Sequence, residues 1–155
     1  MTSRQDIFKW SVQLAGYDHS RADQKGGIDY ENFIGEFRKF PWIEQIETPA
    51  KLPDKCSPTL SVKDLKTGKD FWISMAGDRN DHGYLIGYIY PKEERSFFGL
   101  GVAKTIRWLE IFLTKDTDVV TSLTKLLFER NHHQFEITIR ELDAFDQMES
   151  KDLAD

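Results

Sequence analysis

Residues 71–90 read FWISMAGDRNDHGYLIGYIY, two apolar runs joined by a polar stretch that contains two glycines. The runs Phe71–Met75 and Tyr84–Tyr90 are rich in β-branched and aromatic residues, which favour strands, whereas the intervening residues 77–83 favour a turn. Tyr84–Tyr90 is apolar or aromatic on both faces, which indicates a central strand covered on both sides or one with an exposed aromatic face. The stretch therefore predicts an antiparallel hairpin inside a sheet.

Further strand signals lie on both sides of this hairpin. Residues 60–65 predict a strand that turns at residues 66–69, where Gly68 suits a positive φ. Residues 104–113 fit a helix or a strand, and we favour a strand because β-branched and aromatic residues dominate and no capping residue precedes them. Residues 134–140 alternate apolar and polar side chains, which predicts a strand.

Apolar spacing and capping residues predict the helices. A first helix is expected over residues 7–14, after a start at Ser3 and Asp6, and a loop then runs from Gly16 to Ile28. The next helix follows Asp29 as its N-cap and has an apolar stripe from Phe33 to Phe40. Short helices are also expected over residues 41–46, from Asp116 or Thr117 to Phe128, and within the acidic stretch 141–155.

The expected fold class is α+β, with the element order α-α-β-β-β-β-α-β. Hairpin connections predict a mostly antiparallel sheet of about five strands with helices packed on one face. A chain of 155 residues is the size of one domain. Within it we expect a helical N-terminal part (1–47), a sheet-and-helix part (58–142) and an acidic tail (143–155).

Composition excludes several classes of function. The formal net charge is −5 and the basic residues are dispersed among acids, which argues against nucleic acid as the main partner. No apolar run approaches the ~20 residues that span a bilayer, and the N-terminus lacks the apolar core of a signal peptide. We therefore expect a soluble, cytoplasmic protein without a membrane partner, and we expect no cofactor.

The loop 77–83 is the best local candidate for chemistry. Asp78, Asn80 and Gly83 match positions one, three and six of a calcium loop, but the twelfth position is Ile89 instead of glutamate. A polar turn explains the same residues. Elsewhere the sequence contains no Ser-His-Asp order, G-x-S-x-G elbow or C-x-x-C pair.

Two hypotheses follow from this pattern. The first is a non-enzymatic protein that binds a basic protein partner, for example an acidic immunity or antitoxin protein. Phe97 and Phe98 would then anchor the partner, and Glu93 and Glu94 would speed association with its basic surface.

The alternative is a metal-assisted hydrolase or small-ligand-binding protein. It would use Asp78, Asp81 and His82, joined by Asp18 and His19, because carboxylates and imidazoles are common metal ligands. A homodimer is a third expectation, since a last strand over residues 134–140 would leave a sheet edge open to pairing.

Overall fold

The computed structural model describes residues 7–47, 57–95 and 103–150, which form seven strands and four helices. All seven strands belong to one sheet, in the order β2-β1-β3-β4-β5-β6-β7. Every pair of neighbouring strands is antiparallel. In chain order the elements are β1 (Phe8–Gln13), β2 (Asp23–Gly27), α1 (Tyr30–Lys39), α2 (Trp42–Glu47), β3 (Thr59–Asp64), β4 (Lys69–Gly77), β5 (His82–Arg95), β6 (Ala103–Thr114), α3 (Thr117–Phe128), α4 (His132–Arg140) and β7 (Asp143–Glu149).

The predicted α+β class and the antiparallel sheet are confirmed, but the expected number and order of strands are wrong. The described residues contain seven strands instead of about five, and the order is β-β-α-α-β-β-β-β-α-α-β. The differences lie before residue 28 and after residue 131. Between these positions each predicted element is present with the expected type.

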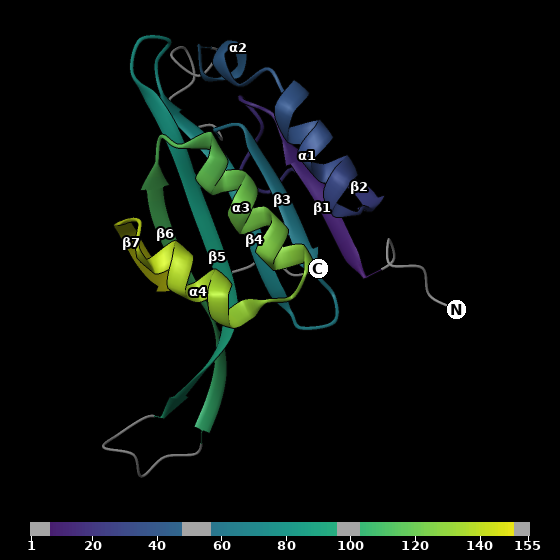
Figure 1. The fold of residues 1–155 in the computed structure, drawn as a ribbon, viewed down its shortest axis with the longest axis vertical. Coiled ribbons are helices and arrows are strands. Elements are labelled where there is room, and N and C mark those ends of the chain that lie inside the picture. Colours follow the sequence, from purple (N-terminus) through teal and green to yellow (C-terminus); the bar gives the residue numbers. More distant parts are fainter. Residues whose placement is uncertain (1–6, 48–56, 96–102, 151–155) are drawn as a thin grey trace.

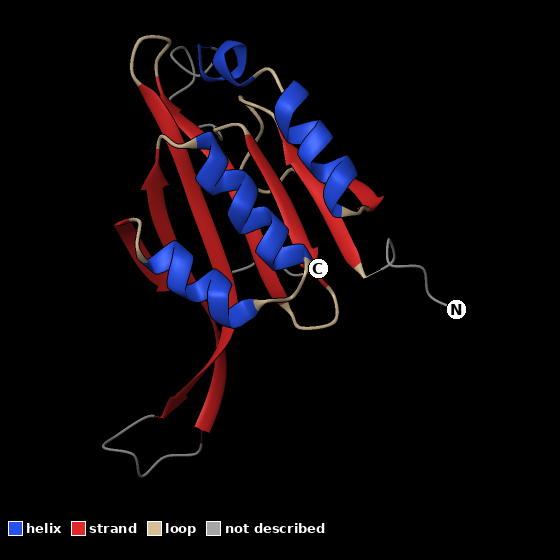
Figure 2. Cartoon of the chain, viewed as in Figure 1, coloured by secondary structure: helices blue, strands red, loops and turns tan. Residues whose placement is uncertain are grey.

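The helices α1, α3 and α4 lie over the same face of the sheet (Figures 1 and 2). Apolar side chains from these helices meet those from alternate positions of the strands, and the core forms between the two layers. The largest side chains that are fully buried there are Tyr88, Phe33, Phe37, Phe71 and Phe135.

Residues 8–13 form β1, and the prediction of a helix over residues 7–14 is wrong. Phe8, Trp10 and Val12 recur at every second position and face the helices, where Phe8 packs on the Phe128 ring at 4.5 Å between centroids. Antiparallel pairing of the whole strand with β3 stabilises this alternation. The apolar residues of this segment only partly follow a helical period, and pairing with the distant strand β3 favours the strand over the helix.

Residues 23–27 form β2, where the sequence predicted a loop. Four of its five residues are exposed, so little apolar side chain supports the strand. Backbone pairing with β1 holds it at the edge of the sheet, and the register shifts between Trp10 and Ser11. Gly26 has a φ of +90° within this strand. The glycines that suggested a loop therefore lie in an irregular edge strand.

Residues 132–140 form the helix α4, and the predicted strand over residues 134–140 is wrong. Phe135 and Ile139, four residues apart, are fully buried, whereas Ile137 between them is 43% exposed. This is the helical period, because residues i and i+4 share a face. Asn131 is the N-cap, and its side chain accepts a hydrogen bond from the Gln134 amide.

Residues 143–149 form the edge strand β7, where the sequence predicted a short helix that frays into a tail. All seven residues are exposed, so the strand has no buried apolar face of its own. It is held by antiparallel pairing with β6, with a register shift between Ile111 and Phe112. Residues 151–155 of the expected tail lie outside the described residues.

Several local predictions in the middle of the chain are confirmed. Asp29 caps α1 by accepting from the Asn32 amide at 2.9 Å, and Asp116 caps α3. Gly68 has a φ of +73° in the turn between β3 and β4, as the turn prediction required. Residues 104–113 are part of the strand β6.

A buried ion pair joins the end of β3 to the junction between α3 and α4. The Asp64 side chain is fully buried and receives both Nε and Nη2 of Arg130, at 3.0 and 3.1 Å. The Thr67 hydroxyl and the Lys66 amide donate to the same carboxylate. Burial alone would raise the pKa of Asp64, but these hydrogen bonds outweigh it and hold the pKa below its ordinary value.

Arg130 reaches this position through a backbone conformation that is uncommon for a non-glycine residue. Its φ is +55°, directly after α3, where glycine usually ends a helix. The left-handed conformation costs about 1–2 kcal/mol for a residue with a side chain. The guanidinium compensates, because it binds Asp64 and lies 4.5 Å from the Phe8 ring centroid.

Replacing Asp64 is expected to destabilise the fold strongly. Asp64→Ala leaves the Arg130 charge without its partner in a largely buried position, and we expect the free energy of unfolding to fall by about 3 kcal/mol or more. Glu47→Ala is the matched control, because it breaks an ion pair with Arg79 that is exposed to solvent and should change little. Urea unfolding followed by tryptophan fluorescence measures both. Equal effects of the two variants would contradict this role for Asp64.

His132, the first residue of α4, is half-buried next to this ion pair, and both of its ring nitrogens are shielded from solvent. Neither ring nitrogen has a hydrogen-bond partner within the part of the chain that the structure describes. Burial and the nearby Lys69 charge lower the pKa of His132 below its usual 6.5. The folded state therefore holds this side chain neutral near neutral pH.

Acid should destabilise the protein through His132. Below about pH 6.5 the unfolded chain binds a proton that the folded chain resists, so the free energy of unfolding should fall as the pH drops through this value. His132→Gln should flatten this part of the pH profile, whereas His133→Gln, at the exposed neighbouring position, should leave it unchanged. Urea unfolding from pH 5 to pH 8 checks this. An unchanged slope in His132→Gln would refute it.

Candidate functional site

The long hairpin of β5 and β6 extends beyond the sheet as a two-stranded arm (Figure 1). Pairing between the two strands continues to Arg95 and Ala103, whereas β4 stops pairing with β5 at Ile89. On the other side, the pairing of β7 with β6 reaches Trp108. We call residues 91–95 and 103–107 the arm.

The arm presents charged side chains to solvent. Pro91, Lys92, Glu93 and Glu94 are all exposed. At its base the Lys92 ammonium lies 4.3 Å from the Trp108 ring centroid, a cation–π contact between β5 and β6. Glu93 and Glu94 are therefore accessible on the arm, and their role in binding a partner stays a prediction.

The two aromatic residues predicted to anchor a partner belong to the connection between the arm strands. Phe97 and Phe98 lie outside the described residues, so their prediction stays a prediction. Their place in the chain follows from the strands on either side, since residues 96–102 link the paired ends Arg95 and Ala103.

The loop 77–83 forms a tight turn whose polar groups bind one another. The Asp78 carboxylate accepts from the amides of Asn80 and Asp81, both at 2.8 Å, and the His82 ring nitrogen Nδ1 lies 3.0 Å from the Asp78 carbonyl oxygen. Asp81 pairs with the Lys115 ammonium at 2.6 Å, which lowers the pKa of Asp81. The Asp78 carboxylate therefore holds the turn itself, and the Asp81 carboxylate links it to Lys115 after β6.

The remaining residues of the metal-site hypothesis lie in the connection between β1 and β2. The side-chain amide of Gln13 donates to the carbonyls of His19 and Arg21, at 3.2 and 3.1 Å, and this orders the connection that contains Asp18 and His19. Among the described residues, no group of three or more His, Cys, Asp or Glu side chains is placed to hold a metal ion. The structure thus does not gather the five predicted residues into one metal centre.

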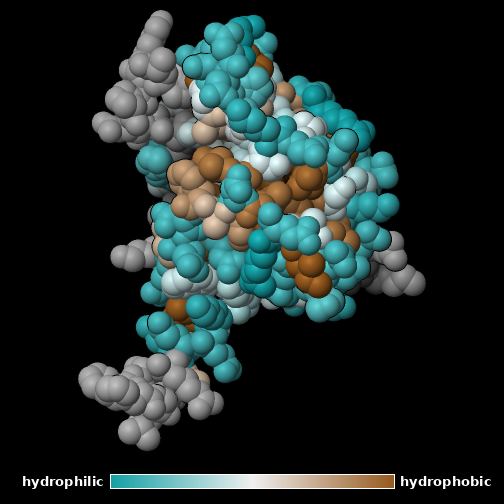
Figure 3. All heavy atoms as spheres, turned by 60° about the vertical axis from the view of Figure 1, so that its left-hand side comes forward, coloured by the Kyte–Doolittle hydropathy of each residue, from teal (hydrophilic) through white to brown (hydrophobic). Residues whose placement is uncertain are grey.

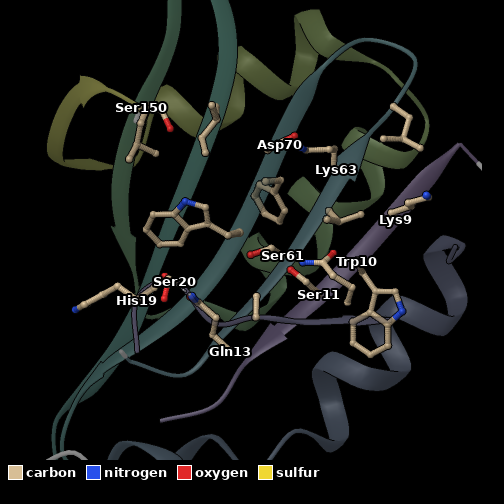
Figure 4. A pocket seen from close by; sticks show the side chains of 18 residues that line it. Lys9, Trp10, Ser11, Gln13, His19, Ser20, Ser61, Lys63, Asp70 and Ser150 are labelled. Carbon is tan, nitrogen blue, oxygen red and sulfur yellow. Dashed lines mark hydrogen bonds between the residues drawn. The ribbon is translucent and has the colours of Figure 1, made fainter. Parts of the chain in front are cut away.

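The face of the sheet opposite the helices contains a hollow of about 800 Å³ (Figure 4). On β3 the side chains of Ser61 and Lys63 alternate with the buried Leu60 and Val62, so they point away from the helices. The hollow combines polar side chains from β1, β3 and the β1–β2 connection with the indole of β4, among them Ser11, Gln13, His19, Ser61, Lys63 and Trp72.

The indole of Trp72 covers part of this face. It lies directly against the backbone of Gly87 on β5, so that a Cβ atom at this glycine would overlap the ring. At the neighbouring position of β4, Asp70 pairs with the Arg107 guanidinium at 2.9 Å. Sequence reasoning did not identify this face, although the alternation of serine with valine and leucine in β3 is a signal for it.

A polar network fastens α4 to the strands that bear the arm. The hydroxyl of Tyr88 donates to Glu136 of α4, and that of Tyr90 donates to Glu110 of β6, both at 3.0 Å. The Arg140 guanidinium bonds Glu110 as well. Burial and the neighbouring carboxylates raise the pKa of Tyr88 and of Tyr90. These tyrosines therefore stay protonated and position the base of the arm.

The side of the sheet formed by β6 and β7 exposes apolar side chains. Five large hydrophobic residues of the described chain are exposed, and four of these lie on α4, β6 and β7: Leu113, Ile137, Phe145 and Met148. Figure 3 brings this side of the molecule forward and shows hydrophobic residues gathered in the middle of the face. Within the described residues, no helix is long and apolar enough to cross a membrane.

The contact between Trp72 and Gly87 gives a test of the packing on the open face. Gly87→Ala should displace the indole and lower the free energy of unfolding by about 1–3 kcal/mol, as overpacking does. Gly35→Ala is the matched control, because its Cβ atom meets nothing within 4 Å on a helix, where alanine is favoured. Thermal and urea unfolding measure both variants. A Gly87→Ala protein as stable as wild type would contradict the contact.

Comparison with family models, with curated proteins and with solved structures found no match for this chain.

Proposed function

We propose that the chain is a non-enzymatic binding protein that holds a basic protein partner, in the manner of an acidic immunity or antitoxin protein. The observation that carries the proposal is the arm. Its strands pair with each other beyond Ile89, where the pairing of β4 ends, and beyond Arg107, whose carbonyl accepts from the Ser150 amide, so the ends of both strands project from the sheet. Ile106 is buried at the base of the arm, whereas the exposed residues 91–94 and 103–105 beyond it offer surface to a partner.

The charge of the arm and of the chain supports a basic partner. Glu93 and Glu94 are exposed next to each other on β5, and the chain has 26 acidic against 21 basic residues. Complementary charges speed association and orient the partner before close contact forms. The carboxylates of the arm would therefore guide the encounter.

The phenylalanines of the connection between the arm strands would supply the affinity. A few aromatic residues commonly contribute most of the binding free energy of an interface, and each such anchor costs about 2 kcal/mol or more when truncated. Phe97 and Phe98 would fill a pocket on the partner and block its active surface. The mechanism would be steric and would need no chemical step.

The alternative, a metal-assisted hydrolase or small-ligand-binding protein at the loop 77–83, has less support. It would require Asp78 and Asp81 to exchange their bonds within the turn and to Lys115 for bonds to a metal ion. Elemental analysis of the purified chain tests it, because a metal bound at stoichiometric level and lost in His82→Ala would favour this alternative over the binding proposal.

The arm is tested by capture from the native cells. The tagged chain should retain one stoichiometric basic protein, and Phe97→Ala with Phe98→Ala should abolish recovery while the circular dichroism spectrum stays unchanged. Glu93→Lys with Glu94→Lys should slow association and weaken its salt dependence. Glu31→Lys with Glu129→Lys is the matched charge reversal, at exposed positions in α1 and at the C-cap of α3.

Two outcomes would contradict the proposal. In the first, the wild-type chain is recovered alone at native level. In the second, the arm variants recover the partner as well as the helix variants do, which would place the interface elsewhere.

A further inference from the structure

The outer edge of β7 presents backbone groups that no described strand uses. The Ser150 amide donates to the Arg107 carbonyl at 2.8 Å, so the amide of Ser150 points toward β6. Backbone groups in an antiparallel strand alternate between its two sides, and the amides of Gln147 and Glu149 therefore point outward. The Gln147 amide confirms this direction, because it bonds the Asp146 carboxylate at 2.8 Å instead of β6.

Exposed apolar side chains lie along this edge. Phe145 is 57% exposed and Met148 is 39% exposed on β7 itself. Leu113 of β6, opposite Asp143, is exposed on the face of the sheet away from the helices, and Ile137 is exposed on α4. An added strand could cover Phe145 and Met148 as well as pair with the backbone, which is how extended peptides bind sheet edges.

The charge of the edge decides which kind of strand it can accept. Residues 141–149 contain four acids, Glu141, Asp143, Asp146 and Glu149, and no lysine or arginine. A second copy that paired antiparallel about Asp146 would place this carboxylate opposite itself, and like charges opposite each other destabilise a strand pair. The acids therefore disfavour a homodimer through β7 and favour a strand that contains lysine or arginine.

We propose that the β7 edge binds an extended basic segment of the protein partner as an eighth strand of the sheet. The inference rests on the proposed function, since it names a second part of the same partner. On binding, the Gln147 amide would exchange the Asp146 carboxylate for a carbonyl of the incoming strand. The released carboxylate would then pair with a lysine or arginine of that strand. The open sheet edge expected at residues 134–140 is thus at β7 instead. We assign it to a strand of the partner and not to a second copy of the chain.

The probe is a fluorescent peptide of seven residues that alternates lysine with valine. Its binding to the full chain is measured by anisotropy at low salt, beside two matched peptides. One has glutamate in place of lysine, and the other keeps the charges but is N-methylated at every second amide. We expect the N-methylated peptide to bind at least about tenfold more weakly, because it cannot form the strand bonds, and the glutamate peptide not to bind.

Variants at Gln147 test the same contact from the side of the protein. Gln147→Pro removes the outward amide without removing a bond to β6, a substitution that edge strands tolerate. Gln147→Ala is its matched control, because both variants lose the bond from Trp108 to the Gln147 side chain. We expect Gln147→Ala to bind the lysine peptide within about twofold of wild type and Gln147→Pro to lose about tenfold.

The possible results separate this inference from the proposed function. Equal binding of the N-methylated and unmodified peptides would show that only charge attracts them, and it would overturn the inference. This comparison uses the wild-type chain, so it holds even if Gln147→Pro does not fold. A concentration-dependent dimer in sedimentation that Gln147→Pro abolishes would assign the edge to a second copy and overturn it too. If the lysine peptide does not bind but capture of the partner depends on the arm residues, only the inference about the β7 edge is rejected. Peptide binding without such capture would reject the role of the arm.

Discussion

The fully buried carboxylate of Asp64 joins the sheet to the junction between α3 and α4. Its hydrogen bonds to Lys66 and Thr67 shape the turn after β3, and its ion pair holds Arg130 at the end of α3. Arg130 accepts an unfavourable left-handed backbone conformation to reach it, and this conformation sets the direction in which α4 leaves α3. The position of α4 in turn fixes Tyr88 and the strands that extend into the arm.

This organisation separates the parts of the molecule that hold the fold from those free to bind. The helices and one face of the sheet form the core, where Asp64, Arg130, Tyr88 and Glu136 are joined to partners across the two layers. The outer part of the arm and the edge of β7 are exposed, and β6 joins them because it pairs with β5 in the arm and with β7 at the edge. A partner could contact the arm and pair with β7 at the same time, because both adjoin β6. Two linked contacts bind more tightly than either contact alone.

Local signals in the sequence predicted the elements whose structure depends on a few neighbouring residues. The hairpin at Gly68 and the capped helices α1 and α3 follow from turn and capping chemistry over a few residues. β1 could not be predicted in this way, because its pairing with β3 spans some fifty residues. The alternation of Phe135, Ile137 and Ile139 fits a strand as well as a helix that exposes its middle residue, and the N-cap at Asn131 was the signal that distinguished them. The candidate binding surfaces were harder still, since only Glu93 and Glu94 of the arm were identified, and the β7 edge has no apolar pattern to reveal it.

Native-state hydrogen exchange tests the central claim, that the Asp64–Arg130 pair locks the helices to the sheet while the outer surfaces stay available. The amides of Arg130 and Asn131, which bond back into α3, should exchange only through global unfolding, with the same free energy as the central amides of β4 and β5. The outward amide of Glu149 should exchange with little protection. Exchange of the Arg130 and Asn131 amides through a local opening, far easier than global unfolding, would show that the helices are not locked and would contradict this account.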